Sequence, residues 1–204
     1  MRMGIRLFRL ADRGSGRVMV TRCLAIVVVS VCVLTCARCG GTTTSASSAP
    51  PRNVTMTFSG LNANAMPVAI YGESGFSISA NPGNWVVSLT YGNPAPFIQF
   101  AAAAGNSVTG QIQVFADLHA AFRFKSVDLY SSTTRIPYTI TGVRDGAVVF
   151  TVADALPNTF GNFRTVVNPR GTDLIDTLTI SLSNSSAPCC SNPMGLDNIV
   201  LQSP

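Results

Sequence analysis

The chain has 204 residues, of which 47% are hydrophobic and 11% are charged, and its mean hydropathy is +0.33. The length fits one domain, and the apolar content is enough to build a core, so a chain disordered throughout is excluded. There is a single His (His119), a single Lys (Lys125), a single Glu (Glu73) and a single Trp (Trp85). Mechanisms that need a histidine cluster, two glutamates or two lysines are therefore excluded by counting.

The formal net charge of +5 belongs to the N-terminal part of the chain. Residues 1–39 contain seven arginines and one aspartate, whereas residues 40–204 contain seven basic and eight acidic side chains. A protein that binds nucleic acid through phosphates needs a basic surface on its folded part. The nearly neutral body therefore predicts no nucleic-acid partner.

Residues 1–39 have the anatomy of a signal peptide. An apolar run of about 14 residues follows Arg22 and ends before Arg38, shorter than the roughly 20 residues of a membrane-spanning helix. Either Met1 or Met19 fits as the start, and the second gives the more compact basic region. The leader predicts an exported protein.

Two processing routes fit the end of the leader. The small residues around Thr35-Cys36-Ala37 suit ordinary cleavage before Arg38, giving a secreted protein. Leu34 and Thr35 before Cys36 also approximate a lipoprotein signal, giving an envelope protein lipidated on Cys36. In both cases we expect the protein to contact a membrane only through its leader or its lipid. Residues 40–52, rich in Gly, Thr, Ser and Pro, predict a flexible linker to a domain over residues 53–204.

From Asn53 onward the chain consists of short alternating apolar runs separated by Gly, Pro and Asn, with no helical period over ten or more residues. This pattern predicts an all-β fold, an antiparallel jelly-roll β-sandwich. The predicted strands are Val54–Ser59, Pro67–Tyr71, Phe76–Ala80, Trp85–Tyr91, Phe97–Ala101, Gly110–Phe115, Ala121–Tyr130, Ile136–Gly142, Ala147–Val152, Gly161–Val167, Thr177–Leu182 and Leu196–Leu201.

Alternation and turn residues refine this prediction. Phe122, Phe124, Asp128 and Tyr130 are spaced to share one face of a strand. Residues 178, 180 and 182 are apolar and alternate with Thr and Ser, which indicates one buried and one wet face. Asp145-Gly146 between two apolar runs predicts a tight hairpin.

The order of several short motifs resembles a group of bacterial exported jelly-roll domains, similar to galactose-binding-like and carbohydrate-binding modules. The motifs are MTFSGL at 56–61, YGESGF at 71–76, FRFKSVDL at 122–129, YTITG at 138–142 and GLDNIV at 195–200. The resemblance spans most of residues 54–202. It implies a sandwich fold, export, and binding of a carbohydrate or another cell-surface component. Ser59 departs from the pattern, because such domains often carry an acidic residue there.

The resemblance also implies a structural calcium ion between the first and last strands. Calcium takes six to eight oxygen ligands. Glu73 and Asp197 are the candidate carboxylates, with Asn198 as a neighbour. The alternative is that Asp197 and Asn198 bond to local backbone.

Candidate ligand residues are aromatic side chains with a neighbouring acid: Tyr130, Tyr138 and Asp128. Trp85 falls on one face with Val87 and Leu89 and is predicted to lie in the core.

Cys189 and Cys190 are the only cysteines distant from the leader. In an exported protein they can form a vicinal disulfide, pair with Cys39 or another chain, or remain thiols, and we interpret them as a loop staple. Zinc is not favoured, because His119 is the only histidine.

We predict a non-catalytic module that binds carbohydrate or a cell surface. One alternative is a structural or adhesive envelope module that binds proteins through an edge strand or apolar patch. A third is an Asp-dependent polysaccharide hydrolase using a pair such as Asp173 and Asp176.

Overall fold

The computed structural model describes residues 50–90, 95–185 and 191–203, and the leader, Cys36, Cys189 and Cys190 lie outside these ranges. Twelve strands and one short 3-10 helix follow one another in the described part. They are β1 (Asn53–Met56), β2 (Ile70–Glu73), β3 (Phe76–Ala80), β4 (Val86–Ser88), β5 (Phe97–Ala102), β6 (Val108–Ala116), η1 (Asp117–His119), β7 (Arg123–Ser131), β8 (Ile136–Arg144), β9 (Ala147–Leu156), β10 (Arg164–Val167), β11 (Thr177–Asn184) and β12 (Asn192–Gln202).

Each of the twelve predicted segments overlaps one of these strands, which confirms the all-β prediction. The predicted hairpin is also confirmed: Asp145 (φ 51°) and Gly146 (φ 78°) form the two-residue turn between β8 and β9, and Arg144 pairs with Ala147. Positive φ at both turn positions is what a tight hairpin matched to the strand twist requires. Within the described residues, no helix is long and apolar enough to span a membrane.

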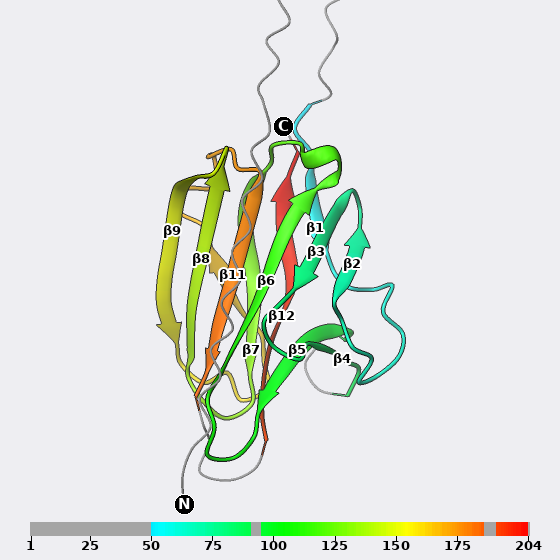
Figure 1. Ribbon diagram of the computed structural model, residues 1–204, viewed down its shortest axis with the longest axis vertical. Helices are drawn as coiled ribbons and strands as arrows, with labels where there is room; N and C mark the ends of the chain where they lie inside the picture. The colour runs from blue at the N-terminus through cyan, green and yellow to red at the C-terminus, as the bar shows by residue number, and fades with distance from the viewer. Residues whose placement is uncertain (1–49, 91–94, 186–190, 204) are drawn as a thin grey trace, which may run out of the picture. The chain divides into compact units, whose positions relative to one another are not determined.

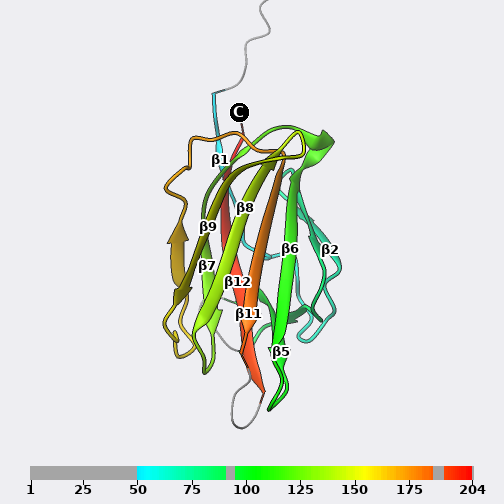
Figure 2. The ribbon, with the colours of Figure 1, turned by 60° about the vertical axis from the view of Figure 1, so that its left-hand side comes forward.

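The strands form two antiparallel sheets that pack as a sandwich (Figures 1 and 2). The first sheet has the order β10-β7-β12-β5-β4, and β1 pairs with β12 beyond the end of β5. The second has the order β2-β3-β6-β11-β8-β9. From β5 to β12 the chain passes repeatedly from one sheet to the other, as in a jelly roll.

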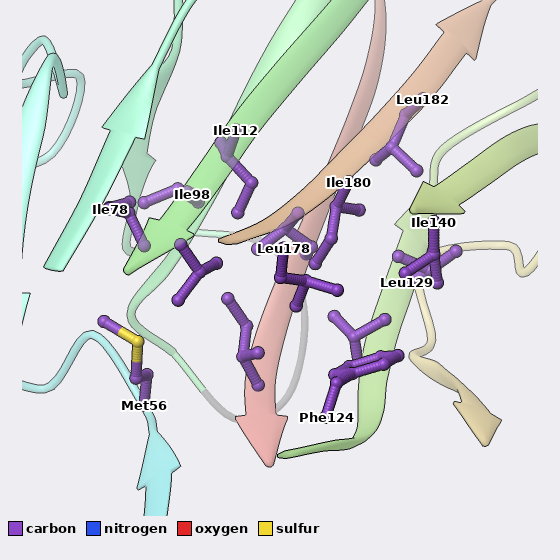
Figure 3. Packing of buried hydrophobic residues seen from close by; sticks show 14 of the residues in the cluster. Met56, Ile78, Ile98, Ile112, Phe124, Leu129, Ile140, Leu178, Ile180 and Leu182 are labelled. Atoms are coloured by element: carbon purple, nitrogen blue, oxygen red, sulfur yellow. The ribbon is translucent and has the colours of Figure 1, made fainter. Parts of the chain in front are cut away.

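The core lies between the two sheets, where alternate side chains of each strand meet (Figure 3). Ile180 and Leu182 of β11 and Phe124 and Leu129 of β7 have no exposed surface. Trp85 and Val87 are also buried, so Trp85 is a core residue as predicted. Truncating one such side chain to alanine costs about 2–5 kcal/mol.

The predicted alternation along β7 is wrong. Phe124 and Leu129 both face the core although five positions separate them, whereas Tyr130 packs outside the main core cluster. The cause is a pair of register shifts where β7 meets β12, between Asp197 and Val200 and between Val200 and Leu201. Such a bulge adds one residue to a strand and moves later side chains to the opposite face.

Candidate functional site

The two candidate ligand tyrosines lie on strands and not on an open surface. Tyr130, on β7, is 2% exposed and packs against Phe97 (ring centroids 4.9 Å apart) and Phe163 (5.7 Å). Tyr138, on β8, is 9% exposed and belongs to the core cluster. Burial raises the pKa of Tyr138, and the charge of Asp154 raises it further. The structure therefore places neither ring where it can stack on a sugar.

Asp128 holds neighbouring elements together. Its carboxylate accepts hydrogen bonds from the Thr165 hydroxyl on β10 (2.5 Å) and from the Asn198 side-chain amide on β12 (2.9 Å). Asp128 is also directly opposite Asp197 in the β7–β12 pairing. The nominated residues Asp128, Asp197 and Asn198 therefore do come together, at the bulge of β12.

Asp197 is the buried acid of this group. It is 1% exposed, and its Oδ1 has no hydrogen-bond partner among the described residues. Burial raises its pKa to about 7; the Asn198 backbone N–H opposes this rise, and the charges of Asp128 and Glu73 add to it. A carboxyl group in such surroundings holds a proton more readily than an exposed one does.

Glu73 has a different environment, because hydrogen-bond donors surround it. Its Oε2 accepts bonds from the backbone N–H groups of Thr57 and Phe58 (both 2.9 Å) and from the Tyr71 hydroxyl (3.3 Å). Its Oε1 accepts bonds from the hydroxyls of Thr57 (2.9 Å) and Ser59 (3.5 Å). Phe58 has a left-handed backbone (φ 57°), which turns its N–H toward the carboxylate beside that of Thr57. One side chain thus ties β2 to the segment that follows β1.

These contacts bear on the predicted calcium site. A carboxylate offers about four lone-pair positions, and the five donors around Glu73 use them, so Glu73 does not fit as a calcium ligand. Within residues 50–90, 95–185 and 191–203, no group of three or more His, Cys, Asp or Glu side chains is arranged to hold a metal ion. Asp197 and Asn198 alone do not supply the six ligands that calcium needs. Calcium stays a prediction of the resemblance, and we assign it no role.

A pocket opens at the end of the sandwich where β1 begins and β12 ends. Its volume is about 310 Å³, and a second hollow of about 390 Å³ shares Arg52, Val54 and Ser74 with it. The β2–β3 turn and η1 stand at this same end, beside the C-terminus (Figure 1). The size is at the lower limit for small-molecule sites, which usually measure about 300–1,000 Å³.

The pocket has an apolar floor and a polar rim. The accessible apolar surface of the floor comes from alanines 116, 120 and 121. Beneath them lie the buried rings of Phe76 and Phe122, which meet edge to face with centroids 5.4 Å apart. The rim carries the exposed side chains of Arg52 and Asp117, with the hydroxyls of Ser74 and Ser203. No hydrogen bond or ion pair within the described residues engages the Arg52 guanidinium or the Asp117 carboxylate. A charged donor and a charged acceptor are thus both available to a ligand.

The turn at η1 borders the pocket and has an unusual backbone. Leu118 (φ 57°) and His119 (φ 54°) are consecutive residues in the left-handed region, where residues other than Gly rarely lie. Leu118 is 98% exposed as a result, and Asp117 and Ala120 on either side of the turn line the pocket. An exposed leucine therefore stands beside the pocket opening.

The aspartates considered for a hydrolase have local partners. Asp173 pairs with the Arg170 guanidinium (2.6 Å), and Asp176 accepts bonds from the Asp145 N–H (2.6 Å) and the Thr177 hydroxyl (2.9 Å). The bond between Asp176 and Asp145 joins the residue before β11 to the β8–β9 turn, so Asp176 positions that turn. The Asp173–Arg170 pair lies within the loop before β11, so Asp173 holds that loop.

Sequence reasoning did not identify the pocket. Arg52 was assigned to the linker, and Asp117 lies 65 positions further along the chain, so no local pattern connects them. The one available signal was the Asp-Leu-His-Ala stretch at 117–120, where polar and apolar residues break the strand pattern.

A comparison with protein-family models found no match, and a comparison with curated protein sequences found none. Solved structures with a similar overall arrangement include a family 29 carbohydrate-binding module from Piromyces equi (10% identity, TM-score 0.44, covering 76% of this chain and 93% of that one). A family 32 carbohydrate-binding module of NanJ from C. perfringens, in complex with galactose, is 11% identical (TM-score 0.38, 68% and 97% covered). An exo-beta-agarase is 13% identical (TM-score 0.42, 70% and 25% covered).

Proposed function

We propose that the protein is an exported, non-catalytic recognition module that binds a carbohydrate, one sugar residue of a glycan or cell-surface polymer, in the end pocket. The observation that carries this proposal is the pocket itself: an apolar floor under a rim with an unengaged guanidinium and an unengaged carboxylate. Export follows from the predicted leader, with the product either secreted or held in the cell envelope by a lipid on Cys36.

The chemistry of a sugar residue matches this lining. A pyranose presents apolar C–H groups on its faces and hydroxyl groups around its edge. The apolar surface of Ala116, Ala120 and Ala121 suits the first. The Arg52 and Asp117 side chains suit the second, because a hydroxyl accepts from a guanidinium and donates to a carboxylate. Leu118 extends the apolar contact beyond the pocket.

The test is binding of the purified full chain to an array of glycans and polysaccharides, followed by calorimetric titration of the selected sugar. Arg52→Gln and Asp117→Asn should each weaken binding about tenfold, because each removes a charge-assisted hydrogen bond. Arg135→Gln is the matched control, since Arg135 is exposed, directly precedes β8 and lies outside the pocket lining. The proposal fails if folded protein binds no glycan, or if the control variant loses as much affinity as the pocket variants.

A further inference from the structure

The edge strand β9 differs from the other outer strands of the sandwich. It has 10 residues, whereas the outer strands β2, β4 and β10 have 4, 3 and 4. Figure 1 shows β9 at the margin of its sheet, beside β8. Short edge strands are one way in which proteins avoid pairing with other chains, and β9 does not have that protection.

One bulge interrupts β9 near its start, where the consecutive residues Gly142 and Val143 of β8 pair with Phe150 and Val148, and the rest of the strand has little protection. Its sequence, AVVFTVADAL, has no Lys, Arg or Pro, and its one charge is Asp154 near the end. Val148 is 65% exposed. Apart from the ladder to β8, the one hydrogen bond that a β9 backbone group makes with the described residues runs from Ala155 N to the Asp154 carboxylate (2.7 Å). The outer side of β9 therefore presents backbone donors and acceptors to solvent.

We propose that β9 is a self-association edge, where the β9 strands of two copies of this chain pair antiparallel about a two-fold axis. The proposal concerns a surface separate from the end pocket and does not depend on the proposed function. An antiparallel edge contact between identical strands closes as a dimer, because each copy uses its one free long edge.

The sequence of β9 is complementary to itself in this arrangement. Directly opposite residues of antiparallel strands point to the same side of a sheet. A pairing centred on Thr151 sets Phe150, which is buried in the core, opposite Val152 of the other copy, which also packs on the core. The two cores then lie on one side of a continuous sheet, and Thr151 is opposite its own copy.

Charge favours the same pairing. Asp154 comes opposite the bulged segment at Val148–Val149 of the second copy and not opposite the other Asp154, so like charges do not meet. Arg144 flanks β9 at the end that carries Val148, because it pairs with Ala147 across the hairpin, and it forms an ion pair with Asp145 (3.6 Å). Each Asp154 thus approaches an end of the other strand whose two opposite charges balance. The nearly neutral body adds little repulsion.

Sedimentation velocity over a concentration series of the full chain tests whether two copies pair through β9. The wild-type protein should show a concentration-dependent dimer. Thr151→Lys and Thr151→Asp should each weaken dimerisation at least about tenfold, because each sets two like charges directly opposite. Mixing the two variants should restore a dimer, since Lys then faces Asp. Thr139→Lys is the matched control, because Thr139 is also exposed but lies on β8, which is paired on both sides.

Unfolding midpoints of all variants show whether each has kept its fold. The Thr151 variants are expected to fold, because the Thr151 side chain is exposed. A wild-type protein that stays monomeric at the highest concentration overturns the proposal, including the case in which β9 pairs with a different protein. Equal weakening by Thr139→Lys and Thr151→Lys, or no recovery on mixing the two Thr151 variants, also overturns it. Glycan binding by the end pocket is measured separately, so the failure of one proposal does not imply the failure of the other.

Discussion

The two sides of the sandwich treat their sheet edges in different ways. On one side, the Glu73 carboxylate at the end of β2 binds the backbone after β1 and joins the two sheets. On the other side, β9 ends its sheet with no such link among the described residues, and the one further bond that its backbone makes with them is within its own strand. The comparison shows that a single carboxylate with enough donors can link the two sheets on one side, whereas the described residues contain no such link at β9.

The largest loss of stability is expected when the link that Glu73 makes between the two sheets is removed. Glu73→Ala removes the acceptor for two backbone N–H groups and two hydroxyls that lie within 3.3 Å. Leaving buried donors unpaired costs about 1–3 kcal/mol each, and part of this is recovered by water because the site is only partly buried. We expect a loss of about 3 kcal/mol in the free energy of unfolding, measured by denaturant titration.

The matched control is Asp154→Ala, which removes a carboxylate from the open edge. Asp154 is exposed and has one hydrogen bond, to Ala155 N, so the change in stability should stay within about 0.5 kcal/mol. Equal losses of stability in the two variants would show that the Glu73 link does not stabilise the fold. The loss of stability in Glu73→Gln should lie between those of Glu73→Ala and Asp154→Ala. The carboxamide oxygen still accepts hydrogen bonds, whereas the NH₂ group faces donors and cannot accept.

A smaller change in stability, in this case a gain, is expected when Asp197 is replaced by asparagine. Its pKa is about 7 in the folded protein against a reference of 3.8, so the folded state keeps a proton that the unfolded chain releases. The stability from this proton is fully present below about pH 4 and is lost as pH rises through 7. Asp197→Asn keeps the shape without the charge and should stabilise the protein by about 2 kcal/mol at pH 8, with little gain at pH 4.

Thermal unfolding of wild type and Asp197→Asn from pH 4 to pH 8 measures this difference. Asn198→Asp supplies a contrast, since it places a second negative charge beside Asp128, to which the Asn198 side chain now donates a bond. A wild-type stability that rises from pH 5 to pH 8 in step with the variant would contradict the protonated state of Asp197.

The smallest effect is expected from chelation. Glu73 is occupied by protein donors, and the described residues include no cluster of three metal-binding side chains. Excess EGTA should therefore leave the melting temperature unchanged within error. A fall in melting temperature that added Ca²⁺ reverses would show that an ion does bind beside Asp197, as the resemblance implies.

The strands could be predicted from the sequence because each depends on local alternation and turn residues. The predicted strand Phe76–Ala80 matches β3 at both ends. The Asp145-Gly146 pair correctly predicts the hairpin between β8 and β9. The face of Tyr130 could not be predicted, because it depends on bulges that form only when β7 pairs with β12. A strand alone has no signal for a register shift set by its neighbour.

The candidate site was predicted only in part, for a similar reason. The sequence motifs identify Glu73, Asp197 and Asn198 as candidates, but they do not identify the residues that these side chains contact. Glu73 binds Thr57 and Phe58, which lie 16 and 15 positions earlier, and the left-handed backbone at Phe58 is a result of folding. The rim residues Arg52 and Asp117 come together only because β1 and η1 reach the same end of the sandwich. Contacts between distant segments have no periodic pattern in the sequence.

The central claim is that the end pocket recognises a sugar residue, and the most direct measurement is amide chemical-shift mapping by NMR with the glycan that the array selects. The account predicts that the largest shifts fall on Gly75, Asp117, Ala120 and Ser203 around the pocket. Shifts centred on the opposite end of the sandwich, for example on Thr133 and Asn184, or a protein that binds no glycan, would contradict it.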